Sequence, residues 1–433
     1  MSPDSRPNIL IYISHDTGRH IGPYGVTTVQ TPNLERVARE GEVFANCFCT
    51  APQCSPSRAS LYTGRYPHQN GVMGLSQGDF AWDFASAEVH AAQRFASLGY
   101  DTAAIGTTHE TRTPENRGFG FINPDSDSRH VAQVLQRWLA ARGDSGNPFY
   151  TQIGTVETHR PWDRNDVEPD DSLGVTVPPY LDDTPGTRSE LAAFQGSIKR
   201  WDEGLGHVLG VLDEQGLAAN TLVVVTTDHG IAMPRAKVTL YDPGIGVLLM
   251  MRWPERIPAG CVYEELVSNV DVLPTLLGAI GITTPKEMAG RSLWPLSPAG
   301  VHQPRKMIFA EKTHHVYYDP MRCVRTERYK YIRNFEKGVE IPLEAIVTPC
   351  GGGATYLENI HRAYHPRTHP LEELYDLQED PFEQTNLAEN PQHRETRESL
   401  AQSLAKWMRD TDDPLLRGPI ASPFYRKAVD TLP

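Results

Sequence analysis

Short apolar runs alternate with helical patterns over the first three-quarters of the chain. The run at residues 8–14 is apolar at nearly every position, which is typical of a strand covered on both faces. Strands separated by helices imply an α/β fold, in which helices flank a mostly parallel sheet. The further strands are expected at residues 102–106, 149–156, 221–226 and 246–251, and helical spacing lies between them, as at residues 91–98 and 189–215.

One predicted helix, at residues 31–41, carries signals at both of its ends. Thr31 is suited to cap the amino terminus, Pro32 suits the first turn, and Gly41 can end the helix. Apolar positions that begin with Leu34 share one face, so this helix is expected to pack against the sheet.

The pattern changes from about residue 301 onward. Short strands followed by one helix predict a small antiparallel sheet with a packed helix. We therefore expect an α/β domain over residues 1–302 and a smaller C-terminal α+β domain over residues 303–433. Two long loops are expected at residues 160–188 and 337–370, and loops of this length are usually functional or mobile. The C-terminal elements are expected at residues 307–310, 323–326, 329–334 and 394–408.

The composition narrows the classes of partner and compartment. The net charge of -13 argues against a general binder of nucleic acid or of an anionic membrane, because those need a basic face. No stretch approaches the roughly 18 apolar residues of a membrane span, and the run at residues 9–13 is too short and too early for a signal peptide. Six cysteines do not make a disulfide scaffold in 433 residues, so we expect a cytoplasmic protein, and a homo-oligomer is compatible with the sequence.

Ionisable residues follow four of the predicted strands. Because the carboxyl ends of parallel strands meet at one edge of a sheet, where ligands collect, these residues are expected to lie together. One such residue alone is more often a cap or a turn residue, but four runs in register weaken that interpretation. The four runs are His15-Asp16, Thr107-Thr108-His109, Glu157-Thr158-His159 and Asp228-His229-Gly230.

Two of these runs predict a metal site. His15, Asp16, Asp228 and His229 together offer up to four ligands for one divalent cation. Carboxylate oxygens suit Ca²⁺ or Mg²⁺, whereas imidazole shifts the preference toward Mn²⁺ or Zn²⁺. We expect Ca²⁺ or Mn²⁺ first and leave Mg²⁺ and Zn²⁺ open. The competing interpretation is that Asp16 caps the next turn and His229 packs under Gly230.

A cysteine stands where a helix is expected to begin. Pro56 suits a first helical turn, so Cys54 is predicted to lie just before a helix amino terminus, where N–H groups and the helix dipole favour an anion. Arg58, one turn on, can fork two oxygens of a tetrahedral oxyanion. Taken alone, a cysteine at such a place is usually a small buried apolar residue.

The sequence around this cysteine resembles a known signature. Residues 54–65, Cys-Ser-Pro-Ser-Arg-Ala-Ser-Leu-Tyr-Thr-Gly-Arg, resemble the signature of the type I, formylglycine-dependent sulfatases of the alkaline phosphatase superfamily. Within that family the likeness is greatest to the sulfamidases, which cleave N-linked sulfate from glucosamine. The family resemblance extends over residues 7–10, 31–34, 227–230, 237–244 and 374–387, and the sulfamidase likeness rests on residues 53–61, 68–71 and 313–322.

The resemblance implies a mechanism and a role for five residues. Cys54 would be oxidised to formylglycine by a separate formylglycine-generating enzyme. One hydroxyl of the hydrated aldehyde, held on the metal, would attack sulfur, and the other would then expel sulfate. Arg58 would help to hold this hydrate. His109 and His159 would assist elimination and protonate the leaving group, and Lys237 would contact the metal-site anions and the sulfate oxygens.

Three positions depart from the family pattern. The resemblance implies metal ligands at His15, Asp16, Asp228 and His229, but the family usually has Asp-Asp at the first pair and Asp-Asn at the second. It usually has a lysine where this chain has Thr107. The site is therefore richer in nitrogen and lacks one cation for the sulfate. Phosphonate monoester hydrolases and phosphodiesterases of the same superfamily also use Asp-His, so a phosphorus substrate competes.

Three functional hypotheses follow. The first is hydrolysis of sulfate esters or sulfamates, on a sugar such as N-sulfoglucosamine. The second is hydrolysis of phosphonate monoesters or phosphodiesters with the same nucleophile. The third is an inactive protein that binds sulfated glycans, which the absence of a lysine at Thr107 motivates. Thr107, His314, His315 and Arg322 are expected to line the substrate pocket, and a surface position of the last three is an equal alternative.

Overall fold

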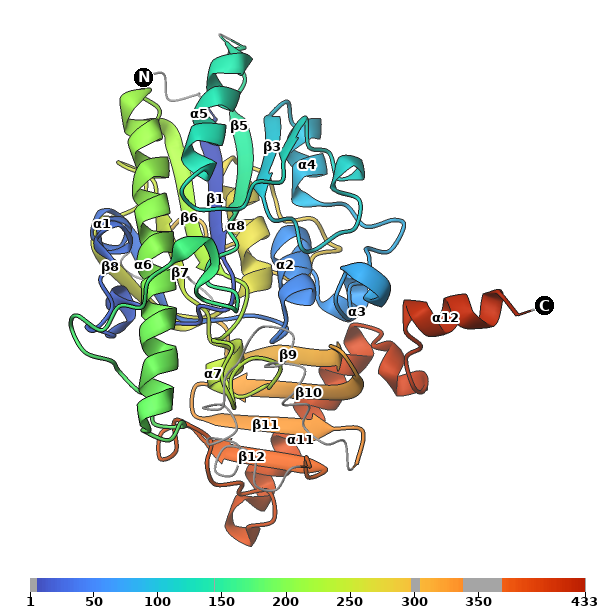
Figure 1. The fold of residues 1–433 in the computed structure, drawn as a ribbon. Helices are drawn as coiled ribbons and strands as arrows, with labels where there is room; N and C mark the ends of the chain where they lie inside the picture. Colours follow the sequence, from blue (N-terminus) through green and yellow to red (C-terminus); the bar gives the residue numbers. More distant parts are fainter. Residues whose placement is uncertain (1–5, 144, 297–303, 338–367, 433) are drawn as a thin grey trace.

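The computed structural model describes residues 6–143, 145–296, 304–337 and 368–432. A large sheet with helices on both faces lies above a small sheet in the view of Figure 1. Seven of the eight strands of the large sheet run parallel and only β7 is antiparallel, which confirms the predicted α/β fold. Its strands, in spatial order, are β4 (Phe121–Asn123), β3 (Asp101–Gly106), β5 (Phe149–Gly154), β1 (Asn8–Ser14), β6 (Thr221–Thr227), β7 (Leu249–Arg252), β2 (Glu42–Phe48) and β8 (Cys261–Ser268).

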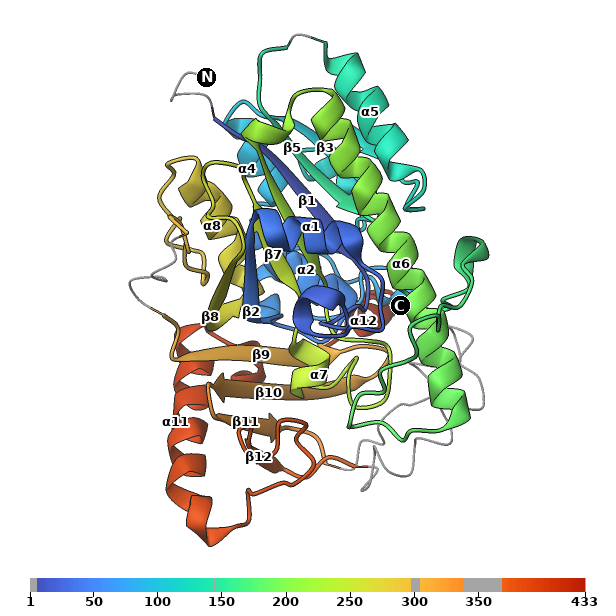
Figure 2. The same cartoon turned by 90° about the vertical axis from the view of Figure 1, so that its left-hand side faces the viewer.

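Two apolar layers hold helices against the two faces of this sheet (Figure 2). One layer contains α1 (Pro32–Glu40), α5 (Val131–Arg142) and the long α6 (Pro185–Glu214). The other contains α2 (Cys54–Thr63), α4 (Ala91–Ser97) and α8 (Val272–Ala279). Among the residues that the structure describes, no helix has the length and apolar character needed to cross a bilayer. The five described cysteines are free thiols.

The amino terminus of α1 is capped differently from the prediction. Thr31 makes no capping hydrogen bond and instead accepts one from the Gly22 amide at 3.3 Å. The carboxylate of Asp202, from α6, accepts hydrogen bonds from the amides of Asn33 at 3.1 Å and Leu34 at 2.7 Å. A charged acceptor at a helix amino terminus also interacts favourably with the helix dipole. The prediction of a Thr31 cap is therefore wrong, because a tertiary contact supplies the cap.

The small sheet is fully antiparallel and α11 (Arg394–Asp410) packs on it, as predicted. Its strands, in spatial order, are β12 (Glu372–Asp376), β11 (Tyr329–Asn334), β10 (Tyr318–Thr326) and β9 (Met307–His314). The predicted domain boundary after residue 302 and most of the predicted loop 337–370 lie outside the described residues. The predicted loop at 160–188 holds only a short 3₁₀ turn, Arg164–Asp166, before α6 begins. The remaining short α-helices among the described residues are α3 (Pro67–Asn70), α7 (Asp242–Ile245) and α12 (Pro423–Asp430).

Candidate active site

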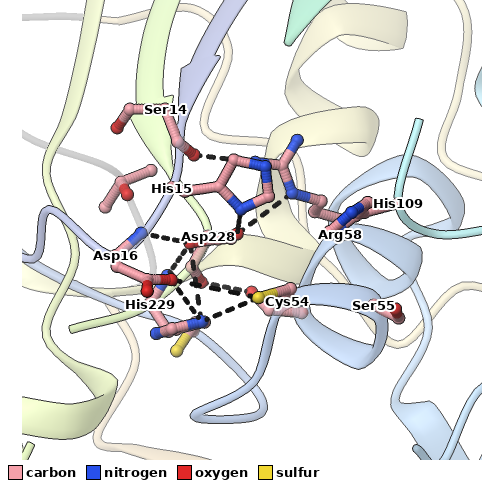
Figure 3. Close-up of polar contacts among 12 residues, drawn as sticks. Ser14, His15, Asp16, Cys54, Ser55, Arg58, His109, Asp228 and His229 are labelled. Atoms are coloured by element: carbon pink, nitrogen blue, oxygen red, sulfur yellow. Dashed lines mark hydrogen bonds and ion pairs between the residues drawn. The ribbon is translucent and has the colours of Figure 1, made fainter. Parts of the chain in front are cut away.

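The carboxyl edge of the large sheet, which faces the small sheet, brings the predicted strand-end residues together (Figures 1 and 3). The loops after β1, β3, β5 and β6 all leave from this edge, because these strands are parallel neighbours. The start of α2, which follows β2, lies at the same edge. The side chains that meet there are His15, Asp16, Cys54, Arg58, His109, His159, Asp228, His229 and Lys237.

Cys54 is the first residue of α2 rather than the residue before it. The preceding residue, Gln53, is extended and supplies no side-chain cap, so the helix amino terminus faces the site. The Cys54 Sγ lies 3.3 Å from His229 Nε2 and 3.9 Å from Asp16 Oδ1 (Figure 3). Every residue of α2 is buried, so Cys54 is held on a well-packed element.

Two buried carboxylates form the centre of the site. Asp16 pairs with Lys237 Nζ at 2.7 Å and with His229 Nε2 at 3.1 Å. Burial alone would raise the pKa of Asp16, but the charges of Lys237 and His229 hold this pKa well below its usual value. Asp228 accepts from Arg58 Nε at 3.1 Å, and its other oxygen accepts from the Asp16 amide at 2.8 Å. Burial likewise opposes ionisation of Asp228, yet His229 and Arg58 keep its pKa well below the usual value.

The orientation of His229 turns one ring nitrogen toward the carboxylates. Its Nδ1 lies 2.9 Å from the carbonyl oxygen of Gly230, which can only accept, so Nδ1 carries a proton. Nε2 therefore faces Asp16 and Cys54. Burial would lower the pKa of His229, but the carboxylates of Asp228 and Asp16 raise it well above the usual value. A backbone acceptor that fixes a ring in this way is common behind metal-binding histidines.

The other three histidines of the site are held in the neutral form. Burial and the charge of Arg58 lower the pKa of His15 to about 3, although its Nδ1 lies 3.1 Å from Asp228. His109 and His159 contact the His15 ring edge-on, with ring centroids 4.8 and 5.4 Å away. Burial, with nearby positive charge, also lowers the pKa of His109 and of His159. His159 Nδ1 donates to the carbonyl of Arg160 at 2.6 Å, which leaves its Nε2 free to exchange a proton.

The donor set of this cluster fits a divalent cation. One ligand atom each from His15, Asp16, Cys54 and Asp228 lies within 4.8 Å of the others, and all four residues are buried. Two carboxylates and imidazole nitrogen are ligands that Ca²⁺ and Mn²⁺ both accept. Arg58 Nη1 is buried and has no hydrogen-bond partner among the described residues, so it could donate to a bound ligand.

The residues predicted to bind substrate divide into two groups. The Thr107 amide donates to the Gly154 carbonyl at 2.7 Å, so Thr107 lies at the site edge directly after β3. His315 is buried, its Nδ1 has no partner, and burial with the charge of Lys237 lowers its pKa well below the usual value. His314 lies on the same turn but its Nε2 faces the carbonyl of Ile420, at 3.0 Å.

Arg322 has contacts that favour a structural role. Its side chain is wholly buried, and its Nε and Nη2 bind the carboxylate of Asp413 at 2.6 and 3.1 Å. Its Nη1 donates to the carbonyls of Lys312 and Met321 at 2.9 and 3.0 Å. No nitrogen of Arg322 is left for a ligand.

Gln77 supports the site and was not predicted from the sequence. Its Nε2 donates to the His109 carbonyl at 3.0 Å, and its Oε1 accepts from the Ser55 hydroxyl at 3.3 Å. Gln77 thus ties the loop that carries His109 to the residue after Cys54. It lies in a loop without a recognisable motif, so only tertiary structure reveals this role.

Matches to known protein families identify this α/β protein as a hydrolase. The chain belongs to the sulfatase family, whose family model matches residues 7–282, and it is a sulfuric ester hydrolase. A second family model, described as N-sulphoglucosamine sulphohydrolase, C-terminal, matches residues 234–344. Both matches agree with the family resemblance of the Cys54 signature.

Two relatives match nearly the whole chain. An ulvan-active sulfatase of Formosa agariphila is 30% identical over 97% of this chain and 83% of its own length. Human N-sulphoglucosamine sulphohydrolase is 30% identical over 96% of this chain and 92% of its own length.

Two solved structures share the fold. One, in complex with its substrate D-glucosamine-2-N,6-O-disulfate, has a TM-score of 0.73 at 19% identity and covers 96% of this chain and 99% of its own. The other, a phosphonate monoester hydrolase of Agrobacterium radiobacter, has a TM-score of 0.72 at 19% identity, over 94% and 96%. At this identity the likeness concerns the fold alone, so it does not separate sulfur from phosphorus substrates.

Proposed function

We propose that this protein hydrolyses a sulfamate or sulfate ester on a glucosamine-type sugar, with formylglycine made from Cys54 as the nucleophile. The buried cluster of Cys54, Asp16 and Asp228 at the start of α2 carries this proposal. The sugar class is inferred from the C-terminal family match and from the relatives named N-sulphoglucosamine sulphohydrolase and ulvan-active sulfatase. The catalytic residues all lie in the predicted domain 1–302.

One divalent cation, Ca²⁺ or Mn²⁺, would be held by Asp16, Asp228, His15 and His229. When bound, it would lower the pKa of the nucleophile and neutralise charge on the transferred group. Lys237 and Arg58 already neutralise Asp16 and Asp228 through contacts of 2.7 and 3.1 Å. Mg²⁺ and Zn²⁺ stay open, because the ligand set mixes oxygen and nitrogen.

The amino terminus of α2 would stabilise the anion that collects at Cys54. Its N–H groups and the helix dipole favour negative charge. Hydration of the formylglycine aldehyde would supply two hydroxyls, of which one would attack sulfur and the other would then expel sulfate. A formylglycine-generating enzyme is the expected partner in maturation. Arg58 Nη1, which has no partner in the part of the chain that the structure describes, is the donor best placed for an oxygen at this position.

Proton transfer would fall to His109 and His159. The hydrogen bond from His159 Nδ1 to the Arg160 carbonyl fixes the ring, so Nε2, which carries no proton in the neutral form, would first take up a proton and then deliver it to the leaving nitrogen or oxygen. The lowered pKa of His159, caused by burial and Lys237, makes its protonated form a strong acid. Thr107, His315 and His314 are proposed to contact the sugar or its sulfate.

A substrate panel tests this function. The protein would be produced together with a formylglycine-generating enzyme, and the Cys54 peptide would be checked by mass for conversion. N-Sulfoglucosamine and an aryl sulfate should turn over faster than a phosphonate monoester. Turnover of the phosphonate monoester alone would overturn the proposal. That outcome is the second candidate function, which the Asp228-His229 pair favours.

A further inference from the structure

The exposed aromatic side chains of this protein are concentrated in one region. Among the described residues, only four large aromatic side chains are strongly exposed: Phe80 by 38%, Tyr317 by 55%, Phe424 by 63% and Tyr425 by 62%. They come from three segments far apart in the sequence, namely the 3₁₀ turn Gly78–Phe80, the turn between β9 and β10, and α12. We call these four side chains the aromatic rim.

Two of the three segments are joined directly to active-site residues. The turn Gly78–Phe80 follows Gln77, whose side chain binds the His109 carbonyl and the Ser55 hydroxyl. The carbonyl of Tyr317 accepts from the His315 amide at 3.1 Å, and the charge of Lys237 acts on the buried ring of His315. The segments that carry Phe80 and Tyr317 are therefore each joined to residues next to the active site.

The third segment, α12, is linked to the other two segments. Just before α12, Ile420 receives the His314 ring on its carbonyl at 3.0 Å and donates its amide to the Tyr318 hydroxyl at 3.1 Å. The helix itself lies beside the turn Gly78–Phe80. Figure 1 shows α12 leading away from the body of the molecule beyond α3. Phe424 and Tyr425, at its start, thus belong to a helix beside the turn Gly78–Phe80, and the chain just before this helix contacts His314 and Tyr318.

The side chains of the rim and of α12 indicate which kind of ligand binds there. No residue of α12 is buried, although a helix of eight residues is marginal by itself in water. Exposed apolar groups gathered in one place mark a binding surface. Arg426 and Lys427 are exposed on the same helix, in a chain whose net charge is -13. Flat aromatic faces beside cations match a ligand with apolar C–H faces and negative charges.

We propose that the aromatic rim binds the sugar units that follow the sulfated unit in the active site, so that the substrate is a sulfated oligosaccharide rather than a single sugar. Pyranose rings present flat C–H faces that pack on aromatic rings, and their sulfate or carboxylate groups pair with Arg426 and Lys427. The inference rests on the proposed function, because two segments of the rim are joined to residues beside Cys54 and Lys237.

Kinetics with two substrates of different length test the rim. Phe424→Ala/Tyr425→Ala would be compared with wild type on N-sulfoglucosamine and on a tetrasaccharide that ends in N-sulfoglucosamine. The tetrasaccharide should lose about tenfold in kcat/KM through a higher KM, and the single sugar should be unaffected. Val262→Ala, which removes an equally exposed side chain from β8, serves as the matched control. Equal effects on both substrates, or none, would overturn the proposal.

A binding measurement separates failure of the rim from failure of the proposed function. Cys54→Ala should bind the tetrasaccharide in calorimetry, and the triple variant with Phe424→Ala and Tyr425→Ala should bind it about tenfold more weakly. If wild type hydrolyses neither sugar but this difference in binding persists, the proposed reaction fails and the rim stands. If the rim instead mediates a dimer that Phe424→Ala/Tyr425→Ala dissociates in sedimentation, the saccharide assignment is overturned.

Discussion

Two wholly buried arginines pair with aspartates in the two halves of this protein, and they differ in one respect. Every guanidinium nitrogen of Arg322, in the small sheet, donates a hydrogen bond to Asp413 or to a backbone carbonyl. Arg58, at the edge of the large sheet, binds Asp228 and the Ser14 carbonyl but leaves Nη1 without a partner. A buried donor without a partner costs about 1–3 kcal/mol, which a ligand or an ordered water would offset. We therefore interpret the complete network as structural and expect the incomplete one to contact a ligand.

The same contrast holds for the neighbouring lysines. Lys330, between the two sheets, places its Nζ 3.0 Å from the Leu240 carbonyl, 2.6 Å from Asp242 and 2.8 Å from Glu383. These contacts hold the segment that carries Lys237. Lys237 Nζ is itself within contact distance of a single carboxylate, that of Asp16. Burial and charge alone would not have separated the two roles.

The largest expected effect is at the nucleophile. Cys54→Ala should reduce kcat by about 10⁴-fold or more, since removal of a nucleophile leaves only the other catalytic groups. The melting temperature should stay within a few degrees of wild type, since the site and not the core is lost. Cys49→Ala, at an equally buried cysteine five residues earlier, should keep its turnover. A Cys54→Ala protein that is unfolded at ordinary temperature would contradict the separation of site from core.

Substitution of the two arginines by methionine tests the comparison directly. Arg58→Met should lower kcat by about 10²–10³-fold, the usual loss for a donor that contacts the developing charge. Its KM for N-sulfoglucosamine should change less. Steady-state kinetics on protein whose folding is verified by circular dichroism would measure both. A variant with full turnover would remove Arg58 from the catalytic group.

Arg322→Met should act on stability instead. It leaves the buried Asp413 without its cation, which costs about 3–5 kcal/mol in the free energy of unfolding. Denaturant unfolding measures this loss, and turnover per folded molecule should match wild type. An unchanged stability with a raised KM would instead support the expectation that Arg322 lines the substrate pocket.

Metal binding should stabilise the fold only through the group of His15, Asp16, Cys54 and Asp228 at the edge of the large sheet. Ca²⁺ or Mn²⁺ at 100 times its Kd would add about 2.7 kcal/mol to the free energy of unfolding. The rise in melting temperature on addition of the ion should vanish in Asp16→Asn and persist in Asp413→Asn. A persistent rise in Asp16→Asn would place the ion elsewhere, for example at the buried group of His68, Glu311 and Asp413.

The smallest expected effect is a shift in acid unfolding. Burial would raise the pKa of Asp413, but Arg322 lowers it below the usual value, so this pair stabilises the fold above a pH of about 4 and less as the pH falls below that. Without Arg322 the pKa of Asp413 should rise. Because the buried Asp413 would then take up a proton more readily in the folded than in the unfolded protein, Arg322→Met should lose less stability on acidification than wild type, and a pH series of melting temperatures measures this. Parallel curves for the two proteins would contradict the role of the pair.

The sequence predicted elements that depend on local pattern and missed those that depend on partners. The strand Asn8–Ser14 was predicted with its observed bounds, because both faces are buried and nearly every residue is apolar. Strand β2 was not predicted, since Glu42 and Asn46 interrupt its apolar pattern although Glu42 is buried. The strand predicted at residues 246–251 begins only at Leu249 and runs antiparallel.

The same limit applied to the site residues: local pattern could be predicted, but contacts between distant residues could not. The convergence of His15, Asp16, Asp228 and His229 could be predicted, because the carboxyl ends of parallel strands share an edge. The partner of Arg322 could not, because Asp413 is 91 residues away and no pattern links the two. Gln77 was missed for the same reason.

The burial of α2 bears on when Cys54 could be modified. Cys54, Ser55, Pro56, Ser57 and Arg58 are all inside the folded molecule and wound into a helix. Under the proposed function, a modifying enzyme would have to reach this segment, so conversion of Cys54 is expected to precede the closing of the fold. The yield of active protein would then depend on the rate of modification relative to the rate of folding. Slowing synthesis should raise the converted fraction, whereas adding the modifying enzyme to folded protein should not.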